Sequence, residues 1–273
     1  MKHRFICLFA VLLGCLISPV ACRAQVQLPA GFHKLELTVD GVARSGFVYA
    51  PASAKETPTP VVFVFHGHGG TALQAGRSFA MHKHWPEAIS VYLQGLNTPG
   101  KLTDPEGKKP GWQHGAGAEG DRDLKLFDAV MANLKENYKV DAKRIFSTGH
   151  SNGGGFTYLL WQTKPEVFCA MAPSAAASAR LADASFKPKP AMHIAGTQDP
   201  LVKYAWQELA MNKVRQINQC EAEGKSWAQD CTLFPSKVGA PFVAFIHQGT
   251  HKFPDEAPAL IAKFFKEQSA AVK

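Results

Sequence analysis

Apolar and mixed segments alternate along the chain and predict strands and helices in turn. Two alternating segments, 34–39 and 44–49, read as strands joined by the turn Asp40-Gly41. Segment 61–65 is apolar throughout, which is typical of a central strand covered on both faces. Further strands are expected at 88–93, 145–148, 168–172, 191–194 and 242–246, and helices at 124–138, 153–162 and 257–267. This alternation predicts the α/β class, with a mostly parallel central sheet, helices on both faces and a single domain.

The first 24 residues differ from the rest. A basic start, an apolar stretch over 5–17 and small residues before Gln25 are typical of a secretory signal peptide. The apolar stretch is too short to span a bilayer comfortably, so no stable membrane insertion is expected. We therefore predict a signal peptide over 1–24, a folded domain over 25–273 and a secreted or periplasmic location. A lipoprotein processed at Cys22 is the alternative, which Pro19 disfavours.

Charge and composition exclude some functions. The formal net charge of +8 is spread along the chain rather than gathered in runs, which indicates a solvated basic surface. No nucleic-acid-binding motif and no phosphate-binding glycine loop accompany it, so no nucleic-acid partner is expected. The sequence leaves the oligomeric state open.

Three of the six cysteines lie in the leader. Cys220 and Cys231 flank a polar stretch, and export into an oxidising compartment predicts a disulfide between them. Cys169 remains unpaired in an apolar segment, where a buried structural thiol is expected rather than a reactive one.

The pattern around Ser151 carries the clearest chemistry. Gly149-His150-Ser151-Asn152-Gly153 stands between a predicted strand and a predicted helix, the context of the nucleophile elbow. Glycines two residues before and after the serine permit the tight turn that exposes its hydroxyl. A simple glycine-rich turn is the alternative interpretation.

A nucleophilic serine requires a base, and the base requires an acid to orient it. Asp199 follows the strand 191–194 after a turn of small residues, at the expected carboxyl edge of the sheet. The alternative for Asp199 is a helix N-cap. His251 lies in the loop after the last strand and is favoured as the base over His247, which is closer to that strand. His193, within a strand, is expected to be a core residue, and His150 to shape the turn.

The oxyanion of acyl transfer needs fixed N–H donors. We assign the amide of Asn152, directly after the nucleophile, and the amide of His68 in the glycine-containing loop after the strand 61–65. His66 and His68 could instead bind a metal, but no further ligands stand at a suitable spacing, so no metal is expected. Ester cleavage by such a set requires no cofactor.

The long segment 95–120 lacks a regular pattern and precedes the elbow, so it is expected to border the site. Trp112 within it is a candidate substrate-binding residue that would stack on an aromatic acyl group or a sugar ring. The alternative is that Trp112 anchors its own loop.

Taken together, these motifs resemble the secreted α/β-hydrolase esterases of the polyhydroxybutyrate depolymerase and feruloyl esterase family. The matching segments are Val64-Phe65-His66-Gly67-His68-Gly69-Gly70, the stretch 140–146 leading into Gly149-His150-Ser151-Asn152-Gly153-Gly154, Asp199-Pro200-Leu201-Val202 and Gly249-Thr250-His251-Lys252-Phe253-Pro254. The resemblance implies the α/β-hydrolase fold, with Ser151 as nucleophile, Asp199 as acid and His251 as base. The chain departs from the family after His251, where Lys252-Phe253-Pro254 replaces the frequent Thr-Trp-Pro.

We therefore predict a serine carboxylic ester hydrolase that acts through an acyl-enzyme, with hydroxycinnamate (feruloyl-type) esters of plant polysaccharide as its first substrate class. Polyhydroxyalkanoate (hydroxybutyrate) depolymerisation is the alternative, and a peptidase of the same fold is a third. The non-enzymatic alternative is an inactive hydrolase-fold binding module.

Overall fold

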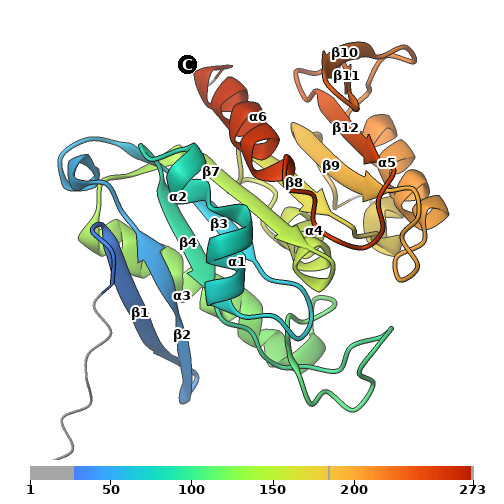
Figure 1. Cartoon of the computed structure of the whole chain (residues 1–273). Helices are drawn as coiled ribbons and strands as arrows, with labels where there is room; N and C mark the ends of the chain where they lie inside the picture. Colours follow the sequence, from blue (N-terminus) through green and yellow to red (C-terminus); the bar gives the residue numbers. More distant parts are fainter. Residues whose placement is uncertain (1–27, 184, 272–273) are drawn as a thin grey trace, which may run out of the picture.

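The computed structural model describes residues 28–183 and 185–271, so the expected signal peptide at 1–24 lies outside the described residues. The chain folds around a ten-stranded sheet (Figure 1). In spatial order the strands are β1 (Phe32–Val39), β2 (Val42–Tyr49), β4 (Ile89–Leu93), β3 (Thr59–Phe65), β7 (Val140–His150), β8 (Ala170–Ser174), β9 (Ala191–Gly196), β12 (Phe242–His247), β11 (Cys231–Phe234) and β10 (Lys225–Ala228). The strands from β4 to β12 are parallel, and the hairpins β1–β2 and β10–β11 add antiparallel edges. The mostly parallel sheet is confirmed.

Helices cover both faces of this sheet (Figure 1). They are α1 (Ala72–Phe79), α2 (Met81–His84), α3 (Arg122–Asn137), α4 (Asn152–Thr163), α5 (Tyr204–Ile217) and α6 (Ala257–Ala271). One apolar cluster joins the sheet to α3, α4 and α5, and a second joins its other face to α1, α2 and α6.

The central strand β3 shows how the two layers form. All of its residues are buried. Phe63 points into the first cluster, where its ring lies 4.8 Å from that of Phe127 in α3. Val62 and Val64 point into the second cluster. Because successive side chains of a strand alternate between faces, a strand covered on both sides is apolar throughout, as the sequence predicts.

The first hairpin also follows from its residues. Val39 pairs with Val42, which leaves Asp40 and Gly41 as a two-residue turn. Their φ angles are +49° and +78°, and Asp and Gly tolerate this left-handed region better than other residues. The expected turn is therefore present.

Several elements were not predicted, among them α1, α2, α5 and the hairpin β10–β11. A signal for α1 does exist, because Thr71 and Gln74 form a reciprocal capping box at its start. The segment 95–120, expected to be irregular, contains a short ribbon of β5 (Leu96–Asn97) and β6 (Pro110–Gly111). Among the described residues, no helix combines the length and the apolarity needed to cross a membrane.

Candidate active site

Ser151 lies at the sharp turn between the carboxyl end of β7 and the start of α4. Its φ of 56° and ψ of −118° are strained for a residue with a side chain. A Cβ at Gly149 would lie 2.5 Å from the backbone of Gly153, and one at Gly153 would lie 2.3 Å from the carbonyl oxygen of Phe65. Neither position has room for a methyl group, which is the steric reason for the pattern. The strand-turn-helix context read from the sequence is present.

The structure brings the three distant residues of the predicted set together. The hydroxyl of Ser151 lies 2.9 Å from Nε2 of His251, and Nδ1 of His251 lies 2.7 Å from Oδ2 of Asp199. With Nδ1–H donating to the carboxylate, Nε2 is free to accept the proton of the Ser151 hydroxyl. Ser151, His251 and Asp199 are therefore linked by hydrogen bonds in the order that a nucleophile, a base and an acid require.

The carboxylate of Asp199 is fixed on both oxygens. Its side chain is completely buried, whereas that of His251 is 19% exposed. Oδ1 accepts hydrogen bonds from the amides of Leu201 and Val202, at 2.8 and 2.9 Å. Asp199 is therefore not the N-cap of the following helix, because α5 begins after Lys203. The burial of Asp199 is compensated by these donors.

The other histidines occupy different environments. Nδ1 of His247 accepts a hydrogen bond from the amide of Gly249, and burial lowers the pKa of the His247 imidazole. His150 hydrogen-bonds to the hydroxyl of Ser174 through Nδ1 and donates from Nε2 to the carbonyl of His251, at 2.8 Å. Burial lowers the pKa of His150 to about 4, so this ring is neutral and supports the backbone of His251. His247 does not occupy the position between the serine and the acid.

The loop after β3 lies next to the nucleophile. A Cβ at Gly67 would lie 3.6 Å from Cβ of Ser151. No backbone hydrogen bond involves the amide of His68 in the described part of the chain, and Asn152, as the first residue of α4, has no earlier helical carbonyl to bind. Both amides therefore have no backbone acceptor among the described residues, and Asn152 directly follows Ser151. The ring of His68 pairs with Asp104 at 3.0 Å.

The side chain of Asn152 has a function that the sequence did not indicate. Its Oδ1 accepts from the amide of Trp112 at 2.7 Å, and its Nδ2 donates to the carbonyl of Trp112 at 3.0 Å. This pair of hydrogen bonds fastens the segment 95–120 to the elbow. The segment therefore borders the nucleophile, as expected.

The prediction that Trp112 binds substrate is wrong. Its side chain is fully buried, and its indole N–H donates to the carbonyl of His66 at 2.9 Å. The indole stacks on Phe156 and meets the edge of Phe65. Trp112 thus anchors its own loop, because a large apolar ring with one donor is most stable where both parts are satisfied inside.

The prediction of a disulfide between Cys220 and Cys231 is also wrong, since both are free thiols. Cys220 lies opposite Ser236, whereas Cys231 is at the start of β11, five residues earlier. At a strand rise of about 3.3 Å per residue, β11 alone, from Cys231 to Phe234, extends about 10 Å and separates the two. A disulfide requires Cα atoms within about 7 Å.

Burial raises the pKa of Cys169 to about 11, so this thiol is not a ready nucleophile.

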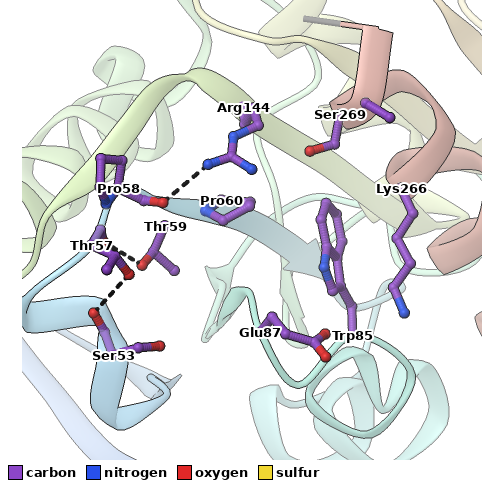
Figure 2. A pocket seen from close by; sticks show the side chains of 11 residues that line it. Ser53, Thr57, Pro58, Thr59, Pro60, Trp85, Glu87, Arg144, Lys266 and Ser269 are labelled. Atoms are coloured by element: carbon purple, nitrogen blue, oxygen red, sulfur yellow. Dashed lines mark hydrogen bonds between the residues drawn. The ribbon is translucent and has the colours of Figure 1, made fainter.

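A cavity of about 440 Å³ lies away from this site (Figure 2). It is lined by Thr59 at the start of β3, Arg144 in the first half of β7, Trp85, Glu87 and the last turns of α6. Ser151 follows the other end of β7, so the cavity and the triad are at opposite edges of the sheet. Ser151, His251 and Asp199 are not among the residues that line this cavity.

The described residues contain no group of three or more His, Cys, Asp or Glu side chains arranged to bind a metal. His66, one of the two candidates, accepts a hydrogen bond from the amide of Gly95 at Nε2, and burial lowers the pKa of its imidazole. His68 is engaged with Asp104.

Comparisons with known proteins find similarity to a peptidase family and to proteins named as esterases. The profile of the prolyl oligopeptidase family matches residues 107–187, which include Ser151. The chain is 26% identical over 119 residues to a bifunctional acetylxylan esterase/xylanase of Neocallimastix patriciarum, covering 44% of this chain but 17% of that protein. It is 26% identical over 201 residues to a probable feruloyl esterase C of Aspergillus flavus, covering 73% of this chain and 69% of that protein.

Solved structures show the same architecture. An acetyl xylan esterase from Aspergillus awamori superimposes with a TM-score of 0.63 at 12% identity, covering 86% of this chain and 99% of that one. A ferulic acid esterase superimposes with a TM-score of 0.57 at 14% identity, covering 87% and 97%. The chain therefore has the predicted α/β-hydrolase fold, and its relatives support an ester hydrolase.

Proposed function

We propose that this protein is a serine carboxylic ester hydrolase that acts through an acyl-enzyme. The observation that carries the proposal is the hydrogen-bonded series Ser151–His251–Asp199, with contacts of 2.9 and 2.7 Å. A serine hydroxyl becomes a nucleophile when a neighbouring imidazole takes its proton, and a buried carboxylate stabilises the imidazolium that results.

In the proposed reaction, His251 Nε2 takes the proton of Ser151 while its oxygen attacks the ester carbonyl carbon. The amides of Asn152 and His68 donate to the oxyanion of the tetrahedral intermediate. The C–O bond to the alcohol then breaks, and His251 gives its proton to the departing oxygen. Water attacks the acyl-enzyme with His251 again as base, which releases the acid and restores Ser151.

For the substrate we propose hydroxycinnamate esters of plant polysaccharide. The support is the similarity to proteins named as feruloyl and acetylxylan esterases. The burial of Trp112 removes one expected aromatic contact, so the acyl specificity depends on other residues. The prolyl oligopeptidase match makes a peptide substrate the second candidate. We also propose export through the leader at 1–24, which N-terminal sequencing of the protein from its host would test.

The test compares purified protein with Ser151→Ala on p-nitrophenyl acetate, methyl ferulate, acetylated xylan, hydroxybutyrate oligomers and a prolyl peptide. We expect turnover of the esters to fall by at least about a thousandfold in the variant, because the acyl-enzyme cannot form. We also expect a fluorophosphonate probe to label Ser151. Equal ester hydrolysis by the two proteins contradicts the mechanism, and absence of both turnover and labelling favours an inactive binding module.

A further inference from the structure

A line of buried hydrogen bonds continues from Asp199 into the core, on the side away from Ser151. Gln207 in α5 approaches Oδ2 of Asp199 with its Nε2, at 3.2 Å. Its Oε1 lies 3.3 Å from Nε2 of His193 in β9, and Nδ1 of His193 lies 2.8 Å from the hydroxyl of Tyr158 in α4. The line therefore connects two helices and a strand to the acid of the triad.

The direction of each hydrogen bond follows from its neighbours. Nε2 of Gln207 also lies 2.7 Å from the carbonyl oxygen of Val202. That carbonyl and the carboxylate of Asp199 can only accept, so the amide NH₂ of Gln207 must face them and its oxygen must face His193. His193 therefore carries its proton on Nε2, and its bare Nδ1 accepts from the hydroxyl of Tyr158. All three links donate toward Asp199.

Burial removes these side chains from solvent. The side chains of Gln207 and His193 are fully buried, and Tyr158 is 1% exposed. Burial also lowers the pKa of His193 to about 4, so the ring is neutral at neutral pH and has one proton to place. A broken link would leave a polar atom unpaired in the core, which is costly. The line is thus held in a single arrangement.

We propose that Gln207 is a positioning residue for the carboxylate of Asp199, and that His193 and Tyr158 fix the orientation of the Gln207 amide. With the opposite orientation, the oxygen of Gln207 would face two acceptors and repel the carboxylate that holds His251. The proposal rests on the proposed function of Ser151, His251 and Asp199. Tyr158 is separated from His251 by four successive hydrogen bonds. Its proposed role is to select the tautomer of His193.

The first test needs no altered active site. In the full-length protein labelled with ¹⁵N-histidine, the His193 signals, assigned by their loss in His193→Asn, report which ring nitrogen carries the proton. We expect the proton on Nε2 and a bare Nδ1. A proton on Nδ1 overturns the proposal, whether or not the protein hydrolyses esters.

The second test uses Gln207→Met, which removes the amide at nearly constant volume. The matched control is Gln216→Met, an exposed glutamine on the same helix. We expect kcat and kcat/KM of Gln207→Met to fall together by about 10- to 100-fold, since a hydrogen bond to a buried charge is lost, with KM within about twofold of wild type. A purely structural role would lower thermal stability and leave kcat of the folded fraction unchanged.

Tyr158→Phe tests the far end of the line and serves if Gln207→Met does not fold. We expect it to lower kcat and to move part of the His193 population to the Nδ1–H tautomer. Wild-type kcat in either folded variant overturns the proposal. Retained turnover in Ser151→Ala overturns the proposed function instead, and the ¹⁵N result distinguishes the two failures.

Discussion

At the scale of single residues, Gly111 decides how closely the segment 95–120 approaches the elbow. A Cβ at this position would lie 2.7 Å from Nδ1 of His68 and 3.0 Å from Oδ1 of Asn152. These are the two residues whose amides we propose as oxyanion donors. Gly111 fits against both residues because it has no side chain. It therefore constrains the proposed oxyanion site, although it belongs to none of the motifs recognised in the sequence.

We expect Gly111→Ala to lower kcat by about tenfold or more, because the added methyl group displaces His68 or Asn152 and misaligns an oxyanion donor. The matched change is Gly155→Ala in α4, where a Cβ would have no neighbour within 4 Å. That variant should retain activity and gain up to about 1 kcal/mol of stability, since alanine favours the helix. Ester kinetics and urea unfolding measure both, and a wild-type kcat in Gly111→Ala contradicts the expectation.

At the scale of elements, a buried ion pair holds the strand β2, the segment 95–120 and the helix α3 together. Arg44 in β2 donates to Oδ1 of Asp123 at 2.7 Å, and at most 1% of either side chain is exposed. Oδ2 of Asp123 accepts from the amide of Gln113, whose Oε1 in turn accepts from the amides of Asp123 and Leu124. The carboxylate therefore joins three elements rather than capping the helix.

We expect Asp123→Ala to destabilise the protein by about 3–5 kcal/mol, because it leaves the Arg44 guanidinium buried without its partner. Asp128→Ala, which removes an exposed ion pair with Lys164, serves as the control and should have a small effect. Urea denaturation gives the free energy of unfolding for each variant. Similar losses in the two would show that burial of the pair does not matter.

At the scale of the whole molecule, two buried neutral histidines should make stability depend on pH. Burial lowers the pKa of both His150 and His193 to about 4. In the unfolded chain a histidine titrates near 6.5. Between about pH 6.5 and 4 the unfolded state therefore binds protons that the native state does not, so the free energy of unfolding falls as the pH falls.

The expected slope is about 1.4 kcal/mol per pH unit for each histidine, once the pH is well below 6.5. His150→Asn should show a shallower decline over this range, whereas exposed His33→Asn should match the wild type. Urea unfolding at intervals between pH 7 and 4 measures the slopes. An unchanged slope in His150→Asn would show that this ring does not remain neutral in the native state.

The sequence by itself determined the fold class, the elbow and the residues of the candidate triad. These depend on local rules: periodicity separates strands from helices, and the crowding of Gly149 and Gly153 admits no side chain. In a parallel sheet the carboxyl ends of the strands meet at one edge. The order Ser151, Asp199, His251 along the chain therefore indicated that the three residues converge, although the sequence could not supply their distances.

Tertiary structure alone decided the remaining contacts of the site and of the cysteines, because these contacts depend on how distant elements pack. Trp112 turns inward because its ring stacks on Phe156 and packs edge-to-face with Phe65, and because the carbonyl of His66 accepts its N–H. Cys220 and Cys231 are near in sequence, but strand register separates them. The partners of Asp199 beyond His251 come from helices and strands brought together only by folding. Local sequence patterns indicate which chemistry a segment can perform, whereas packing determines which atoms come into contact.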